Sequence, residues 1–559
     1  MGSDSVEGQG EESIFSMVDE LTTGIKKKLE LSEAEIANDI DRTVGEIVTS
    51  SPEALKYFMR ATEFSRIGDF SQCIEPLKRA ISIDPKFARA YIFLGSAYSN
   101  MGNSAEMNEY YQKAFEHKVR LSEIQRLRLE ILVFSKSEKT YGNAFKAYDQ
   151  LLELYPDEWR VNAIGMIYKN LENWDNSVEL FNRWIQHKDY DSYMSNVNLA
   201  ETYMAKGLYD KAKEILDVNK SNFSENAWVR IVLAINYLSQ GDYKMSLAEA
   251  DKAFLLDPSL YYLFWIKGDV YHCMNDLTKA EQQYLRLMET NIPASQFYAR
   301  DGIGALYLYR GMASESMSQI ELGIEKAEEM NDEIWEPWFL SCLVYTQLAL
   351  GNPEEALRLS DKLLSIEVGG QRLDFKRRAL FFKGLTYIMM ESLELAQKLA
   401  DEYRMIIQDQ MNQKEMRFYH FLIGKIELQK ENYSNAIECF ERALSLLHFE
   451  FYRFPTLVAN DHALFIESLA FAHYKNGELD KAIEEYGRIA TLTLGRIHYG
   501  DIYVKSFYML GKIYEEQGDN AKAIAHYEIF LDLWKDADPG IAEVEDARER
   551  LANLRVNNP

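Results

Sequence analysis

Cysteine is scarce in this chain, with four residues in 559. Cys73, Cys273, Cys342 and Cys439 lie far apart, each inside a predicted helix, and none forms a Cys-x-x-Cys pair or a cluster with histidine. Isolated cysteines of this kind are expected to be reduced packing residues. The usual structural zinc sites are excluded by this spacing, so we expect no metal.

Motifs for catalysis and cofactor binding are also missing. The nine histidines are scattered, without a His-Glu-x-x-His, Gly-x-Ser-x-Gly or glycine-rich phosphate-loop pattern. In one stretch Arg496, His498 and Asp501 could serve acid/base chemistry if a partner completed the site. A simple inter-helix loop is the interpretation we favour there, because no other feature points to this stretch. We therefore predict that the chain is not an enzyme and has no catalytic or cofactor-binding residues.

Positive charge is in short supply. Lys and Arg number 62 against 88 Asp and Glu, a net charge of −26. So acidic a surface argues against direct binding to nucleic acid or insertion at an anionic membrane. No apolar run is long enough to cross a bilayer, and the first residues do not resemble a secretory signal. We expect a cytoplasmic location, with the periplasmic side of a membrane-anchored parent protein as the alternative.

What the chain does contain is one unit that recurs at a fixed interval. The landmarks Ala234, Tyr237, Gly241, Ser246 and Ala250 are followed 34 residues later by Gly268, Tyr271, Asn275, Ala280 and Tyr284. A period near 34 indicates an array of helix pairs. The small residues allow two antiparallel helices to approach to about 8–10 Å. Gly241 can adopt a positive φ after one helix, and Asp242 can cap the next.

The small residue at the eighth position of the unit can be followed along most of the chain. It predicts thirteen units, with this position at Ala61, Gly95, Leu132, Gly165, Ala200, Ala234, Gly268, Gly304, Cys342, Gly384, Gly424, Ala470 and Gly511. Because one helix pair cannot bury its apolar face alone, neighbouring pairs must stack, each touching only its neighbours.

Repeat length and composition divide the chain into five parts. Residues 1–13 are predicted to be a disordered tail, and residues 14–50 a helical lead-in. Units 1–7, of ordinary length, occupy residues 51–292, and longer units 8–13 occupy residues 293–540. Residues 541–559 are expected to form a polar capping helix.

The repeat resembles the tetratricopeptide repeat. This resemblance implies an all-α fold, a right-handed α–α superhelical solenoid of about thirteen tetratricopeptide-like helix pairs. The lead from Glu11 to Leu55 is similar to the junction that precedes such arrays in large bacterial signalling proteins, next to a TolB-like domain, Ser/Thr kinase or cyclase. If the resemblance holds, the chain is the sensory or docking arm of such a protein.

The face on which this family binds its partners turns apolar from the eighth unit onward. Chaperone-binding members clamp a peptide carboxylate with Lys and Asn at positions five and nine, and this clamp is absent here, where the positions read Ile92/Ser96, Asn162/Met166, Val197/Glu201 and Trp265/Asp269. The later units carry the residues that we predict to form a groove: Phe339, Leu343, Phe381, Leu385, Ile388, Phe421 and Tyr474. The groove either receives a protein or peptide partner or is covered by the repeats themselves.

Two functions remain open at this point. The first is a non-enzymatic scaffold for protein–protein interaction, with a partner in the concave groove. The second is a small-ligand-sensing arm of a transcriptional regulator or kinase, because long repeats of this sort resemble the sensor arms of bacterial regulators related to the maltose activator.

Overall fold

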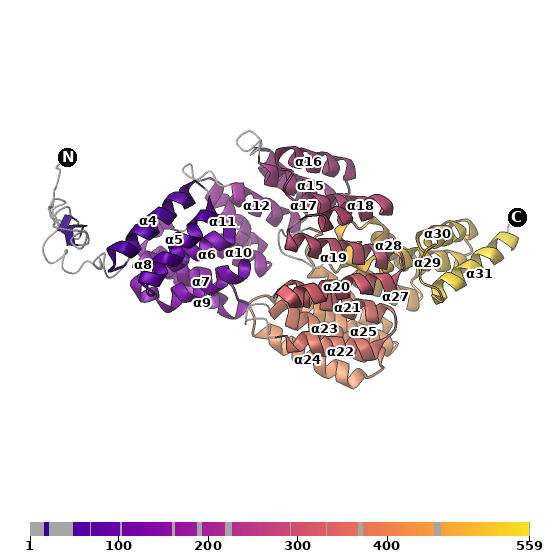
Figure 1. Cartoon of the computed structure of the whole chain (residues 1–559). Helices are drawn as coiled ribbons and strands as arrows, with labels where there is room; N and C mark the ends of the chain where they lie inside the picture. Colours follow the sequence, from indigo (N-terminus) through magenta and orange to yellow (C-terminus); the bar gives the residue numbers. More distant parts are fainter. Residues whose placement is uncertain are drawn as a thin grey trace. The chain divides into compact units, whose positions relative to one another are not determined.

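A computed structural model describes residues 16–18, 20–21, 49–67, 69–100, 103–158, 162–186, 193–218, 226–290, 292–330, 332–366, 373–451 and 460–557. Throughout these ranges the regular structure is helical, and thirteen consecutive helix pairs follow one another (Figure 1). The prediction of an all-α solenoid of about thirteen pairs is confirmed. Every helix in this part of the chain is too short or too polar to span a bilayer.

Each predicted eighth position lies in the first helix of a pair. These first helices are α4 (Pro52–Arg66), α6 (Ala88–Asn100), α8 (Glu123–Phe134), α10 (Asn162–Asn170), α12 (Tyr193–Ala205), α15 (Ala227–Ser239), α17 (Tyr262–Cys273), α19 (Pro293–Tyr309), α21 (Trp335–Ala349), α23 (Leu373–Met389), α25 (Met416–Gln429), α27 (His462–Lys475) and α29 (Gly500–Glu516).

The second helices pack against them in turn. They are α5 (Phe70–Ile83), α7 (Ser104–Glu116), α9 (Tyr141–Leu154), α11 (Trp174–Ile185), α13 (Tyr209–Val218), α16 (Tyr243–Leu256), α18 (Leu277–Met288), α20 (Ala313–Met330), α22 (Pro353–Ser365), α24 (Leu393–Gln408), α26 (Tyr433–Ser445), α28 (Leu479–Thr491) and α30 (Asn520–Leu533). The last helix is α31 (Ala542–Asn557), and short 3₁₀ helices include η5 (Gln413–Glu415) and η6 (Leu494–Tyr499).

A recurrent hydrogen bond joins the two helices of a pair at their closest approach. The side chain of Ser246 on α16 donates to the carbonyl oxygen of Ala234 on α15 at 2.7 Å. Ser316 donates in the same way to Gly304 at 2.8 Å. Since the small residue brings its backbone within reach of the partner helix, the spacing of landmarks in the sequence has a direct structural cause.

The turn within a pair also forms as predicted. Gly241 has a φ of 75°, in the left-handed region that favours glycine. The carboxylate of Asp242 accepts a hydrogen bond from the backbone N–H of Met245 at 3.1 Å and caps α16.

Glycine at the eighth position leaves space for an aromatic ring. A Cβ atom added to Gly268 would lie 2.3 Å from the ring of Tyr284, and one added to Gly302 would lie 2.5 Å from the same ring. The Tyr284 hydroxyl donates to Asp269 at 2.6 Å, which holds the ring in place. The ring therefore has no room to move away from an added methyl group on either side.

We expect Gly268→Ala to destabilise the protein by about 1–3 kcal/mol through overpacking. Gly487→Ala in α28 is the matched control, because a Cβ atom there meets nothing within 4 Å and alanine raises helix propensity by about 1 kcal/mol. The urea midpoint of unfolding should fall in Gly268→Ala and rise in Gly487→Ala. Equal effects at the two glycines would contradict this account of the packing.

The chain divides into two compact units, residues 1–167 and 168–559. The first unit holds the pairs from α4 to α9, with a core around Phe58, Phe87 and Leu94. Helix α10 crosses the division. The predicted change of repeat length at residue 292 does not coincide with this division and stays a description of the sequence. The predicted tail, residues 1–13, and nearly all of the lead-in, residues 14–50, lie outside the described residues.

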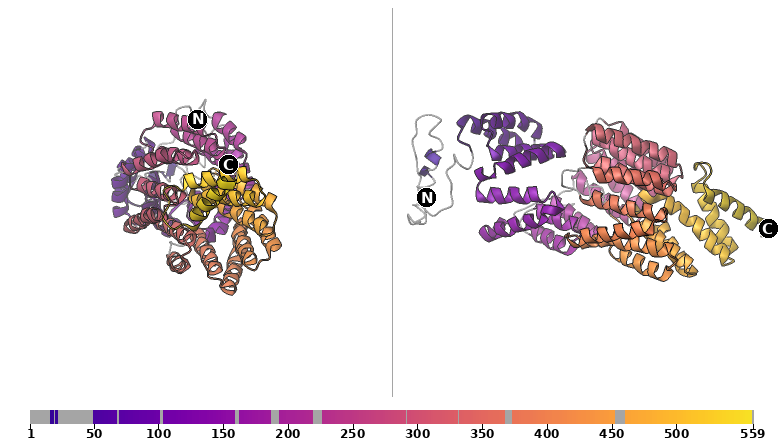
Figure 2. Two further views of the ribbon diagram at one scale, coloured as in Figure 1. Left: turned by 90° about the vertical axis from the view of Figure 1, so that its right-hand side faces the viewer. Right: turned by 90° about the horizontal axis from the view of Figure 1, so that it is seen from below.

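The second unit does not follow the expectation that each pair touches only its neighbours. Helix α19 packs against both η6 and α29. The Trp534 indole donates to the backbone oxygen of Tyr309 at 2.9 Å, and the Asp538 N–H donates to the Gly311 oxygen at 3.0 Å. In the end-on view of Figure 2 the magenta-to-orange helices of this unit curve round, and α29 packs against α19.

We call these long-range contacts the clasp. One side of the clasp consists of residues 412–417, 449–451, 492–503 and 534–538. The other side lies within residues 170–314. The expectation of purely neighbouring contacts is wrong for this unit, because superhelical curvature brings the late repeats back against the middle ones.

Candidate functional site

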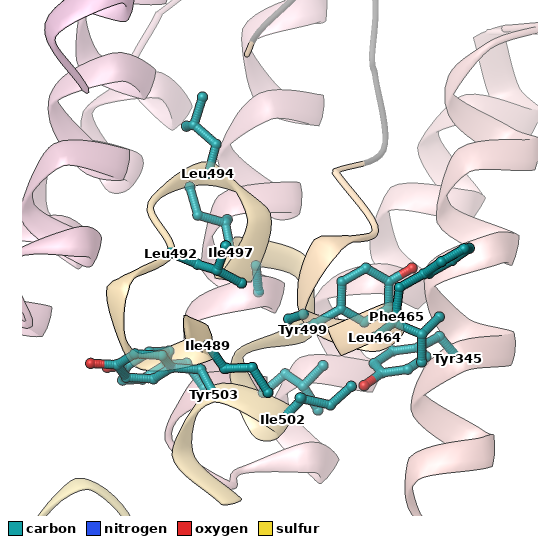
Figure 3. Packing of buried hydrophobic residues seen from close by; sticks show 14 of the residues in the cluster. Tyr345, Leu464, Phe465, Ile489, Leu492, Leu494, Ile497, Tyr499, Ile502 and Tyr503 are labelled. Carbon is teal, nitrogen blue, oxygen red and sulfur yellow. The ribbon is translucent and has the colours of Figure 1, made fainter. Parts of the chain in front are cut away.

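The connection between α28 and α29 lies inside the second unit. We call residues 492–501 the plug; they include η6. Its apolar side chains are almost fully buried, with Leu494 1%, Ile497 2% and Tyr499 2% exposed. Figure 3 shows this stretch running between helices on both sides, with Tyr499 near Tyr345 and Phe465. The connection between helices was predicted, but its burial was not.

One carboxylate holds the start of the plug. Glu450 Oε2 accepts hydrogen bonds from the backbone N–H of Thr493 at 2.9 Å and of Gly495 at 2.6 Å. The backbone oxygen of Glu450 accepts from the Tyr209 hydroxyl at 3.0 Å. The segment around Glu450 thus links the plug to the fifth helix pair.

Backbone and side-chain contacts join the plug to α17. The Cys273 thiol lies 3.5 Å from the Thr493 oxygen, and the Arg496 guanidinium donates to the Cys273 carbonyl oxygen. The guanidinium carbon of Arg496 lies 4.0 Å from the centre of the Tyr503 ring. Burial raises the pKa of Cys273 to about 12, so this thiol is unreactive near neutral pH.

His498 makes a buried ion pair in the middle of the plug. Its Nε2 lies 3.1 Å from Asp301 Oδ2, while the Trp338 indole donates to Asp301 Oδ1 at 2.7 Å. Burial lowers the pKa of His498, but the charge and hydrogen bond of Asp301 outweigh it, and the net pKa is raised. A carboxylate from α19 thus favours the protonated form of His498.

A second charged group lies at the end of the plug. The Tyr499 hydroxyl donates to Asp461 Oδ1 and accepts from Arg378 Nη2 at 3.2 Å. Arg378 also reaches Asp461 at 3.4 Å. Burial raises the pKa of Asp461, but Arg378 outweighs it, so the carboxyl group stays ionised with a lowered pKa.

The three residues with possible acid/base roles do not converge. Arg496 is bound to a backbone carbonyl and His498 to Asp301. Asp501 accepts from the Tyr345 hydroxyl at 2.8 Å, and burial raises the pKa of Asp501. Each group is used in closing the second unit, so the arrangement has the character of a structural clasp.

A small cavity of about 30 Å³ lies beside the plug. It is lined by apolar and small residues of α19 to α21, and its polar end is formed by Asp301, Arg378, His498 and Tyr499. A space of this size admits one or two water molecules. In the described part of the chain no three His, Cys, Asp or Glu side chains are placed to hold a metal ion.

Sequence reasoning missed Asp301 and Arg378. Both lie on first helices, at the fifth and second positions of their units. For Asp301 the available signal was a charge at a position where the neighbouring units carry Trp265 and Phe339. Arg378 gave no such signal, because the preceding unit carries Glu336 at the same position.

The predicted groove residues are mostly buried within the chain itself. Phe339 and Phe421 are fully buried, Phe381 is 1% exposed, and Leu343 and Ile388 are nearly buried. Leu385 and Tyr474 are half-buried. Rings of successive pairs cover one another, as with Phe381 and Phe418, whose centres lie 4.8 Å apart. In this structure these residues join neighbouring repeats and leave no open apolar groove among them.

An exposed apolar surface lies instead on α24. Leu395 is 50% and Met405 65% exposed. A shallow groove of about 780 Å³ runs along this helix. Its lining residues are Leu393, Glu394, Gln397, Lys398, Asp401, Glu402, Met405 and Lys430.

Comparison with curated proteins finds relatives of low identity. The chain is 35% identical over 102 residues to small glutamine-rich tetratricopeptide repeat-containing protein 2 of Mycosarcoma maydis, covering 18% of this chain and 29% of that protein. It is 21% identical over 286 residues to anaphase-promoting complex subunit 3 of Schizosaccharomyces pombe, covering 51% of this chain and 39% of that protein. The chain therefore spans less than half the length of either relative.

A solved structure described as the APC/C hetero-tetramer Cut9–Hcn1 aligns with 95% of this chain and 98% of its own, at 13% identity and a TM-score of 0.34. So low a score supports no argument about function.

Family models give the more specific result. Models described as tetratricopeptide repeat match residues 88–116 and 419–446, 505–537 and 337–362. These four segments coincide with the pairs α6–α7, α25–α26, α29–α30 and α21–α22. With repeats recognised near both ends of the array of helix pairs, the chain contains tetratricopeptide repeats.

Proposed function

We propose that this chain is a non-catalytic scaffold for protein–protein interaction. The observation that carries the proposal is the exposed apolar surface of α24, with Leu395 50% and Met405 65% exposed. Methionine and leucine side chains in an open groove are typical of interaction surfaces. The relative named as a subunit of the anaphase-promoting complex supports the same class of function.

The chemistry of the α24 groove suggests the kind of partner. Glu394, Asp401 and Glu402 border the apolar side chains, and the chain has a net charge of −26. Lys398 and Lys430 line the same groove, so a protein segment whose apolar side chains are bordered by more basic than acidic ones complements this surface. Binding of a peptide in the concave groove of Phe339 and Phe381 requires a state in which these buried side chains become accessible. It stays a proposal for that state alone.

The test is affinity capture with cross-linking, using the purified chain as bait. We expect Leu395→Glu with Met405→Glu to lose the wild-type partner while keeping the helical circular dichroism spectrum. Leu255→Glu on α16 is the matched control, because Leu255 is 81% exposed but distant from α24 in the sequence. Retention of every partner by the α24 variant would remove this surface from the proposal.

The second candidate is a small-ligand-sensing arm, although the cavity beside His498 has room for water only. A metabolite present at 100 times its Kd would stabilise the closed protein by about 2.7 kcal/mol, so thermal melting of the same bait against a metabolite set separates the two candidates. The finer assignment to a bacterial signalling protein rests on the lead residues and stays a prediction. The cytoplasmic location and the absence of direct nucleic-acid binding also remain predictions.

A further inference from the structure

His272 is a buried imidazole without a hydrogen-bond partner among the described residues. It lies on α17, is fully buried, and neither Nδ1 nor Nε2 reaches a donor or acceptor. The ring stands edge-on to the Tyr309 ring, with centres 4.8 Å apart. Leaving a buried polar group unpaired costs stability. A histidine is thus an expensive residue for packing alone at this position.

Cations face His272 from two other elements. The charges of Arg496 and His498 in the plug, and of Arg310 just after α19, each lower the pKa of His272. On its own helix, Asp269 is bound by the Tyr284 hydroxyl.

Other titratable groups surround the same region. Cys273 is the adjacent residue on α17 and lies against Thr493. Tyr503 of α29 is covered by Arg496, and Tyr243 of α16 and Glu450 lie near Cys273. Among these groups Glu450 is already engaged by the backbone of the plug.

We propose that the clasp opens on acidification, because protonation of His272 places a new cation against Arg496 and His498 of the plug. The closed form has no acceptor or counter-charge in contact with the imidazole, whereas the open form exposes the ring to water. Proton uptake therefore favours the open form. This inference concerns the second unit's own conformation and does not depend on which partner the scaffold binds.

The direction follows from the histidines at the clasp. Burial, with the neighbouring cations, lowers the pKa of His272 to about 3 from 6.5. Its contribution to closure is complete above pH 6.5 and is lost as the pH falls. Burial lowers the pKa of His448 to about 4, so His448 acts in the same direction. His498 has a raised pKa and opposes them, since its contribution is complete below 6.5 and is lost as the pH rises.

The size of the effect can be stated for His272 alone. If its pKa is 6.5 in the open form and about 3 in the closed form, the opening constant increases about tenfold between pH 8 and pH 5.5. This range stays above the isoelectric point near 4.9. The figure depends little on the closed-form value, because pH 5.5 is far above 3.

Hydrogen exchange measured by mass spectrometry, corrected for the intrinsic rate at each pH, tests the proposal on the full chain. Peptides covering residues 492–503 should lose protection at pH 5.5 while those in α22 remain protected. In His272→Leu the increase in opening should be about tenfold smaller. His272→Gln gives the same comparison with a neutral polar side chain if the leucine variant folds poorly.

Two controls complete the test. His526 lies on α30, outside the clasp. Its Nδ1 lies 2.8 Å from the backbone oxygen of Lys522, and in the ranges that the structure describes no hydrogen bond joins it to the plug. His526→Leu should therefore behave as wild type. The His448→Gln variant measures how much of the pH-dependent opening is due to His448. An undiminished pH response in both His272 variants, or loss of protection throughout the unit at once, would overturn the proposal.

Discussion

Replacing Phe381 by glutamate should unfold the second unit. The Phe381 ring is 1% exposed, and its centre lies 4.8 Å from that of Phe418 and 5.6 Å from that of Phe421. An ionised carboxylate at this position would lose its hydration without gaining a partner, which costs several kcal/mol. The variant should lose cooperative urea unfolding of the second unit, and this loss should be greater at pH 8 than at pH 5.5, because burial raises a carboxyl pKa.

Met389→Glu provides the matched control on the same helix. Met389 is 44% exposed, so a charge there stays in water and the urea midpoint should hardly change. A Phe381→Glu protein that unfolds like wild type would mean that the ring is accessible in solution. In that case the concave groove would become the preferred site for a partner.

Arg417→Met should have a similarly large effect through electrostatics. Arg417 Nη2 lies 2.7 Å from a carboxylate oxygen of Glu172 and 2.7 Å from one of Glu415, and the arginine is 7% exposed. Removing the guanidinium leaves the buried carboxylate of Glu172 without its cation, while Glu415 keeps its pair with Arg377 at 3.2 Å; the cost is about 3–5 kcal/mol. Urea unfolding at pH 7.5 measures this loss.

The pH dependence identifies the cause. Burial raises the pKa of Glu172, but Arg417 outweighs it and the net pKa is lowered. The pair therefore stabilises the protein above the unfolded pKa of Glu172 and less as the pH falls. The difference in unfolding free energy between wild type and variant should therefore hold from pH 7.5 to 5.5 and narrow only below about pH 4.5, the ordinary pKa of Glu172. Arg442→Met removes the exposed pair with Glu438, 61% exposed on both sides, and should cost less than about 1 kcal/mol.

Local features of the repeat were predictable from the sequence. The small residue at Gly268, the turn at Gly241 and the cap at Asp242 all act within one helix pair, and all are present. Such features depend on neighbours a few residues away or one helix away. The same local logic predicts thirteen pairs, because each landmark repeats with the unit.

The clasp was not predictable in this way. An apolar first-helix face looks the same in the sequence whether a partner, a neighbouring repeat or a distant segment covers it. The plug itself carried a signal, since Leu494, Ile497 and Tyr499 are too apolar for an exposed connection. The period indicates how successive pairs stack, whereas contact between Asp301 and His498 depends on curvature accumulated over several pairs.

Helix lengths of the later units show a further limit. The longer repeat at the eighth unit appears as extended helices, with α19 of 17 and α20 of 18 residues. The sequence left open whether the added residues lengthen helices or form loops. Helix propensity alone cannot decide this, because tertiary packing determines where a helix ends.

The clasp also imposes an order on biosynthesis. Tyr309 stacks on Tyr503, with ring centres 5.4 Å apart, yet about 190 residues separate them in the sequence. At about 5–20 residues per second the ribosome needs about 10–40 s to make that interval. Throughout it, the nascent chain carries completed middle repeats whose contacts with the plug are not yet available. Aggregation and chaperone binding should therefore peak on chains stalled between residues 314 and 492, and fall once the plug has emerged.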